Sequence, residues 1–289
     1  MAVLNGLSDG LLLFLIAGGL TIIFGVLNVI NFAHGSFFMV GAYVTFFLAG
    51  ENAILPAIPG QFWIAVLLSG IIVGLLGGLI ERFLIRPIYD IDHIYQLLLT
   101  FGVLLLIDNG ARIYWGTQFK SVNTPPGLDS HMSILGGAIP RYNLFLIVAG
   151  SVLGIIMWYI FRRTKFGKTT IAAAENQDIA DAVGINVPLV YTAVFIAGSA
   201  LAGIGGALAA PYVSIHPTMG ENFVIEAFIV VIIGGVGSMS GAFIGALLLG
   251  VGGALAFIFA PALQQFIPFI LLVVVLLARP EGIIGEAKA

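Results

Sequence analysis

The sequence predicts an all-α protein, a polytopic transmembrane bundle of about eight or nine membrane segments with broken or re-entrant pieces and one helix outside the membrane. Only 25 of the 289 residues are charged (11 Lys and Arg, 14 Asp and Glu), or 9%, against about 25% in an ordinary soluble domain. Counting glycine, about 70% of the chain is apolar, more than a soluble fold of this length can bury. The apolar runs are long enough to cross a bilayer and lack the strict alternation of β-barrel strands.

The remaining totals exclude several kinds of site. The chain has no cysteine, which rules out disulfides, iron–sulfur clusters and thiolate zinc sites. Its four histidines are scattered without metal-ligand spacing, so we expect no metal. A net charge of −3 predicts no basic surface for nucleic acid. No basic segment precedes the first apolar run, so we expect that run to remain as a membrane segment rather than to be cleaved.

Apolar runs bounded by polar residues, proline or glycine are the predicted membrane segments of a single domain, 1–289. They cover 8–31, 35–50, 61–84, 94–113, 142–161, 189–212, 223–237, 241–259 and 262–278. The second, seventh and eighth are short or interrupted by glycine, so eight crossings fit the pattern as well as nine. Gly74-x-x-x-Gly78 and Gly241-x-x-x-Gly245 are typical of faces on which two helices pack closely.

Basic residues predict which ends of the segments face the cytoplasm. Only Arg112, Lys120 and Arg141 flank the connection 113–141, which we expect outside. The C-terminus is then cytoplasmic, and the side of the N-terminus depends on the number of crossings. The other eight basic residues follow the third, fifth and last segments: Arg82, Arg86, Arg162, Arg163, Lys165, Lys168, Arg279 and Lys288.

Two glycine-containing stretches, 25–36 and 233–241, interrupt the apolar runs, one in each half of the chain. Each leads into a similar helix start, Gly-Ser-Phe or Gly-Ala-Phe, which is a weak internal repeat. Unpaired backbone at membrane depth is tolerated where it is buried or lines a wet cavity, and paired interruptions are typical of a transporter's path. The alternative for either stretch is a tight loop at the membrane surface. The candidate path residues are Asn31, His34, Gly35, Gly235, Gly237 and Ser238.

Ionisable residues within the runs are further candidates, because charge is costly in a bilayer. Asp108 and Arg112 are spaced i, i+4 and are expected to pair with each other. Glu221 is expected at the membrane interface. Glu226 lies deeper, and the sequence leaves open whether it lines the path or bonds to a neighbouring helix.

The loop 163–188 is too polar to span the membrane and lies on the basic side. From Thr170 to Val183 the pattern predicts one amphipathic helix, with Gly184 as its C-terminal stop. Its acidic polar face favours docking of a protein over an interfacial helix lying on lipid, which usually carries Lys and Arg. The predicted faces are Ile171, Ala174, Ile179, Ala182 and Val183 against Glu175, Asp178 and Asp181.

This loop resembles the coupling loop of ABC-transporter permeases, which fits a cleft on the ATPase. The pattern R-T-x-F-G-x…A-x-x-x-x-x-x-A-x-x-x-G-I-N-V is similar to that of the branched-chain amino acid permeases of the LivH/LivM family. Asn-Phe-Ala-His-Gly at 31–35 resembles the signature of the LivH-like branch, and the likeness runs over about residues 6–285. The family often has a more basic start than Ala172–Glu175. The resemblance assigns ATPase coupling to Gly167, Ala173, Glu175, Asp178, Ala180, Asp181 and Gly184.

The resemblance implies a permease subunit of an importer in the bacterial inner membrane, not an enzyme. It implies as partners two ATPase subunits, a second permease (LivM-like or identical), an extracytoplasmic substrate-binding protein and the lipid bilayer. The implied cargo is a branched-chain or related amino acid, moved by alternating access. ATP would be bound by the partner subunits, so no cofactor is expected here. Gly167-Lys168-Thr169 imitates the end of a phosphate-binding loop, but Arg162 stands where that motif needs glycine.

Two other functions stay open at this point. The same family includes permeases for urea or short amides. An ion-coupled secondary transporter or channel would need no ATPase, and the acidic loop argues against it.

Overall fold

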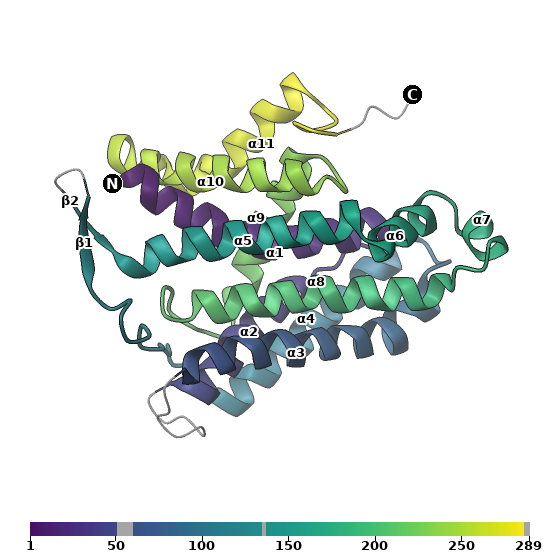
Figure 1. Cartoon of the computed structure of the whole chain (residues 1–289), viewed down its shortest axis with the longest axis horizontal. Helices are drawn as coiled ribbons and strands as arrows, with labels where there is room; N and C mark the ends of the chain where they lie inside the picture. The colour runs from purple at the N-terminus through teal and green to yellow at the C-terminus, as the bar shows by residue number, and fades with distance from the viewer. Residues whose placement is uncertain (51–59, 135–136, 286–289) are drawn as a thin grey trace.

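The computed structural model of the chain describes residues 1–50, 60–134 and 137–285. Most of the helices lie side by side along one direction (Figure 1). The antiparallel hairpin β1–β2 lies at one end of this bundle, and α6 and α7 lie at the other (Figure 1). The elements are α1 (Ala2–Leu27), α2 (Ala33–Ala49), α3 (Gln61–Ile80), α4 (His93–Trp115), β1 (His131–Ile134), β2 (Gly137–Pro140), α5 (Arg141–Arg163), α6 (Lys165–Glu175), α7 (Gln177–Ala182), α8 (Val187–Ala209), α9 (Met219–Gly234), α10 (Met239–Phe259) and α11 (Ile267–Ala278).

The predicted helical membrane bundle is confirmed. Among the described residues, seven helices are long and apolar enough to cross a membrane, and α2 and α9 are shorter apolar helices of 17 and 16 residues. Of the three segments expected to be short or interrupted by glycine, α2 and α9 are short. The third, α10, contains several glycines and is nevertheless a continuous helix of 21 residues, so it is not a half-helix. Its glycines allow α1 to pack closely against it. A Cβ added at Gly6 of α1 would lie only 2.7 Å from the carbonyl oxygen of Gly250 in α10.

The two ends of the described chain lie at opposite ends of the bundle. The N-terminus is at the β1–β2 end (Figure 1). Ile283 and Ile284 donate backbone hydrogen bonds to the carbonyls of Ile233 and Gly234 at the end of α9, and the turn that follows α9 packs against Gly25 near the end of α1, the helix that contacts α6. A chain with this arrangement traverses the bundle an odd number of times, which favours nine segments over eight.

The first helix is shifted from its predicted bounds of 8–31. It begins at Ala2 and ends at Leu27, where Asn28 adopts the left-handed conformation (φ 54°) and its N–H donates to the Phe24 carbonyl. Asparagine tolerates this conformation and ends helices in this way. The residues 28–32 therefore form a connection to α2 rather than the last turns of α1.

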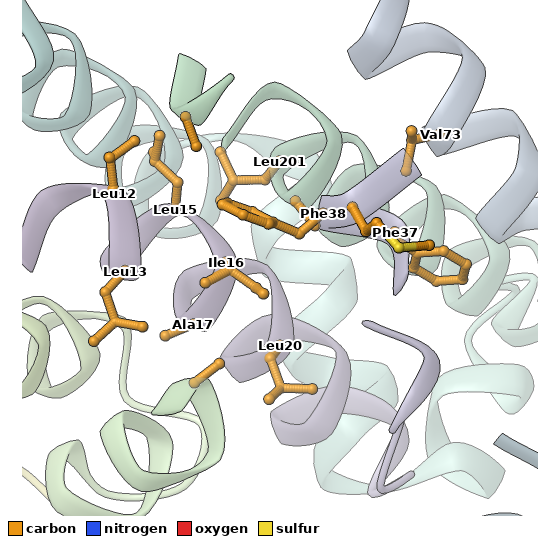
Figure 2. Packing of buried hydrophobic residues seen from close by; sticks show 14 of the residues in the cluster. Leu12, Leu13, Leu15, Ile16, Ala17, Leu20, Phe37, Phe38, Val73 and Leu201 are labelled. Carbon is orange, nitrogen blue, oxygen red and sulfur yellow. The ribbon is translucent and has the colours of Figure 1, made fainter. Parts of the chain in front are cut away.

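The core forms around α1, α2 and α8. Figure 2 shows Leu15 of α1 near Leu201 of α8 and Phe38 of α2, and Leu12 and Leu20 of α1 belong to the same buried cluster. The predicted small-residue faces lie at the neighbouring contacts of α3 with α8 and of α9 with α10. A Cβ added at Gly78 would lie 2.6 Å from Ile196, and one at Gly245 would lie 3.1 Å from the Val230 carbonyl.

The loop 163–188 contains two helices, so the prediction of one amphipathic helix is wrong. α6 ends at Glu175, and the Asn176 side chain accepts from Ile179 N–H at 2.9 Å, which starts α7. An N-terminal cap of this kind competes with helix continuation. The predicted apolar face is also wrong: Ile179 and Val183 are 63% and 71% exposed. The buried side of the pair consists instead of Gly167, Thr170, Ala173 and Ala180.

Candidate functional site

The connection 28–32 runs from the surface into the bundle, because Asn28 is exposed and Asn31 is buried. His34, in the first turn of α2, places its Nε2 3.0 Å from the Ile16 carbonyl oxygen. Ile16 lies eleven residues before the end of α1, or about 16 Å along the helix axis. Phe32 N–H donates to the hydroxyl of Thr100, which is seven residues into α4. The α2 helix therefore begins deep in the bundle, as the interrupted sequence predicts.

Several polar atoms of this buried start have no hydrogen-bond partner among the described residues. Asn31 is fully buried, and neither its amide nitrogen nor its oxygen is bonded. His34 is also fully buried, and its Nδ1 is unbonded. Gly35 packs against Gly220 at the start of α9. A buried polar group without a partner costs about 1–3 kcal/mol, so a conformation or ligand that supplies partners is favoured here.

The second interrupted stretch is a turn between α9 and α10. Gly235 and Gly237 have positive φ angles (96° and 78°), and the Ser238 hydroxyl accepts from Gly241 N–H as the cap of α10. A Cβ added at Gly25 would lie 2.6 Å from Cα of Gly237. The structure thus brings the two interrupted stretches together at the α6–α7 end, while Val236 of this turn remains 54% exposed.

A cavity of about 570 Å³ lies between α1, α9, α10 and the start of α11. Glu226 lines it, and its place on a translocation path stays a prediction. Asp9 of α1 lines the same cavity and accepts a hydrogen bond from Tyr212 at 2.6 Å. Burial and the bond to Asp9 raise the pKa of the Tyr212 hydroxyl, so Tyr212 stays a donor at neutral pH. Asn31 and His34 do not line this cavity.

The predicted coupling residues divide into an anchored and an exposed set. Gly167, Ala173 and Ala180 are buried against the bundle. Gly184 has a φ of 85°, and Ile185 N–H donates to the Ala180 carbonyl, which closes α7 as predicted. The exposed set carries the three acidic side chains and the glycine: Glu175, Asp178, Asp181 and Gly184.

A buried ionic cluster connects α6 to α3 and α8. Glu81 is fully buried and pairs with Arg86 at 3.2 Å, where α3 continues through a π-helical turn. Tyr89 donates to Glu81 at 2.8 Å, and Thr192 of α8 donates to it at 2.7 Å. Burial and the nearby Glu81 charge raise the pKa of Tyr89, which keeps it a donor. The Tyr89 ring contacts Tyr191, whose hydroxyl donates to the Ala173 carbonyl of α6.

Asp108 is not paired as the i, i+4 spacing predicts. Its Oδ1 accepts from the Ser36 hydroxyl of α2 at 2.7 Å, and no ion pair with Arg112 forms within the described residues. The Asp108 side chain faces the packed side of α4, where Ser36 of α2 is within reach. The predicted pair of Asp108 with Arg112 is therefore wrong, and Asp108 bonds to Ser36 of α2 instead.

The family model for the branched-chain amino acid transport system permease component matches residues 2–276. The chain belongs to this family of permeases. It is 32% identical to the high-affinity branched-chain amino acid transport system permease protein BraD of Pseudomonas aeruginosa, over 98% of this chain and 95% of that protein. It is 28% identical to LivH of Escherichia coli K12, over 98% and 94% of the two chains. No solved structure matches it.

Likeness extends to an archaeal relative and, over less of the chain, to a sugar permease. A probable branched-chain amino acid transport permease LivH of Methanocaldococcus jannaschii is 31% identical over 95% of this chain and 89% of its own. The fructose import permease FrcC of Rhizobium meliloti is 31% identical over only 40% of this chain. Membership makes this chain a multi-pass translocation subunit of a transport system and not an enzyme.

Sequence reasoning missed three parts of this permease's sites. Asp9 lies inside the first apolar run, and an acid in such a run is itself a signal that could have found it. Tyr212 approaches it only through the fold. The pair of Glu81 with Arg86 spans five residues, and it forms because a π-helical turn replaces the regular helix there.

Proposed function

We propose that this permease is the membrane subunit of an ABC importer that moves branched-chain or related amino acids inward by alternating access. The observation that carries the proposal is the exposed surface of α6 and α7, with three acids beside unpaired apolar side chains (Ile171, Ile179 and Val183). An amphipathic surface of this kind, outside the membrane, suits a soluble partner more than water. The coupling partners are two ATPase subunits that bind ATP, and this chain binds no cofactor.

The side of the membrane follows from charge. Arg82 and Arg86 follow α3, Arg162 and Arg163 end α5, Lys165 and Lys168 begin α6, and Arg279 follows α11. The chain leaves α3 and α5 at the α6–α7 end of the bundle (Figure 1). By the positive-inside rule this end is cytoplasmic, where ATP is available, and the C-terminus lies there too. The β1–β2 end then faces outward, towards an extracytoplasmic binding protein, and a second permease completes the path in the bacterial inner membrane.

The amino acid cargo is supported by the relatives that match over nearly the whole chain, which are named for branched-chain amino acid transport. The path includes Asn31, His34 and Gly35 at the buried start of α2 and Glu226 in the cavity. The turn with Gly235, Gly237 and Ser238 belongs to the same path, and its Gly237 packs against Gly25 near the end of α1, just before the connection to α2. Opening the bundle would give the unbonded Asn31 amide the partners it lacks.

Reconstitution separates this function from that of an ion-coupled carrier. We expect leucine uptake into liposomes only when this chain is assembled with its ATPase subunits, second permease and loaded binding protein, and only with ATP. Uptake by this chain alone, driven by an ion gradient, would contradict the proposal. A complex that takes up urea or acetamide and not leucine would retain the ATPase coupling but reject the amino acid cargo.

Asn31→Leu should reduce uptake while leaving the fold as stable as before or more so. Leucine has nearly the shape of asparagine and removes an amide whose hydrogen bonds are unmet in this conformation. If the amide bonds to cargo or water in the open path, we expect uptake to fall about ten-fold, or ~1.4 kcal/mol. Uptake rate and thermal unfolding in detergent are the measurements.

Gln96→Leu is the matched control, because its buried amide is bonded to the carbonyls of Ile88, Tyr89 and Ile91. That substitution should destabilise the fold. If Asn31→Leu destabilises the fold in the same way and transport per folded complex is unchanged, Asn31 is a structural residue and lies outside the path.

A further inference from the structure

We propose that the cavity lined by Asp9 and Glu226 is a binding site for the primary ammonium group of the transported amino acid. The inference rests on the proposed function and adds to it which atoms of this chain select the cargo. The two carboxylates come from α1 and α9, helices far apart in sequence that the fold brings to one cavity.

The charge of the cavity points to a cationic group. Its lining contains two acidic side chains and no basic side chain. Met1 also lines the cavity, and its amino group forms no ion pair with either carboxylate among the described residues. A low-dielectric cleft lined by one sign of charge concentrates ligands of the opposite sign. Two carboxylates at the edge of a membrane are costly unless a cation or donor compensates them.

The remaining walls match the rest of a branched amino acid. Apolar side chains from α1, α9 and α10 line much of the cavity, and an aliphatic cargo side chain against them would lose contact with water. Amide groups of Asn5 and Gln264 supply hydrogen-bond donors for a cargo carboxylate. The volume of about 570 Å³ exceeds that of a single amino acid and leaves room for water. The apolar wall is formed by Leu12, Leu13, Phe223, Leu249, Phe257 and Ile258.

Tyr212 holds one of the carboxylates in place. Its hydroxyl donates to Oδ1 of Asp9, which leaves the second oxygen of Asp9 as an acceptor for the ammonium group. The cavity lies at the β1–β2 end, beside the N-terminus, which the proposed topology turns outward. Cargo released by the binding protein would therefore meet this site before the buried start of α2.

The absence of cysteine from the chain allows a direct measurement of the charge in this cavity. Gly253 lines the cavity, and a Cβ added there meets no atom within 4 Å, so Gly253→Cys places a thiol in it without crowding. In the assembled importer, this thiol is labelled with a cationic methanethiosulfonate (trimethylammonium-ethyl) and with an anionic one (sulfonatoethyl). Asn123→Cys, in the exposed connection after α4, gives the reference ratio of the two rates.

We expect the ratio of cationic to anionic labelling at Gly253→Cys to exceed the reference by about ten-fold or more. Adding Asp9→Asn and Glu226→Gln should return it to the reference, whereas Glu221→Gln, on the same helix but outside the cavity, should leave it high. Leucine-loaded binding protein with ATP should slow the labelling. The double variant should also lower leucine uptake, with the loss in the maximal rate or in the apparent affinity of the complex.

Three results would overturn the inference. They are a labelling ratio at the reference value, a ratio that the double variant leaves unchanged, and slowing of the labelling by the amine headgroup of a lipid rather than by leucine. The last is read by comparing nanodiscs that contain phosphatidylethanolamine with nanodiscs of phosphatidylcholine and phosphatidylglycerol. Failure of the proposed function looks different, because the unmodified importer would then show no leucine-stimulated ATP hydrolysis whatever the labelling ratio.

Discussion

Replacement of Glu175, Asp178 and Asp181 by lysine should abolish substrate-stimulated ATP hydrolysis by the assembled importer and leave this permease in the membrane. All three side chains are exposed on α6 and α7, so their reversal removes no buried contact. Charged groups at an interface determine which partner docks, and placing like charges opposite each other costs several kcal/mol. Without docking, the ATPase no longer binds the inward-open and outward-open states of the permease differently, so ATP binding cannot change the population of either state.

The helices themselves should survive this change. Asp178 lies in the first turn of α7, where losing a favourable charge costs at most about 1 kcal/mol. The Asn176 cap and the closure at Gly184 remain. Asp129→Lys is the control, because it reverses an exposed charge in the connection before β1, at the opposite end of the bundle. This variant should retain substrate-stimulated ATP hydrolysis. Stimulation retained in the triple variant, at normal expression, would show that the ATPase docks elsewhere.

Arg86→Met should destabilise the permease by about 3–5 kcal/mol, the usual cost of leaving one charge of a buried pair uncompensated. The Glu81 side chain that would remain is 0% exposed, whereas that of Arg86 is 31% exposed. Arg86 also donates to the Pro188 carbonyl at 2.9 Å and contacts the Thr192 hydroxyl, so α3 and α8 would lose a connection as well. Chemical or thermal unfolding in detergent measures the loss.

Because Arg86 is more exposed than Glu81, the two single variants should lose different amounts of stability. Glu81→Gln should cost less, about 1–3 kcal/mol, because the Arg86 head can turn towards water. The double variant should lose less than the sum of the two single variants, since the removal of both charges leaves none stranded. Arg82→Met, the exposed neighbour, should change stability by less than about 0.5 kcal/mol. Additive losses would mean that Glu81 and Arg86 act independently.

The loop 163–188 shows which features a local sequence pattern can predict. The polar, acidic stretch with Gly184 at its end predicts a helical element outside the membrane and its stop, and both are present. The break at Asn176 and the choice of buried face were not predictable from periodicity. The buried face consists of small residues, such as Ala173 beneath Tyr191, while the larger Ile179 and Val183 remain exposed. Contact of the small residues with the bundle overrides the usual inward preference of larger apolar side chains.

Composition and neighbours along the chain are enough to predict the membrane class, the approximate membrane segments, the clustering of basic residues between particular segments and the interruption near Asn31. Which distant groups meet depends on how the helices pack. Asp9 lies with Tyr212 and Glu226 in one cavity, and Asp108 bonds to Ser36 rather than to Arg112. In a bundle, the partner of a buried polar group is set by which helix packs beside it, and spacing along one helix carries no information about that.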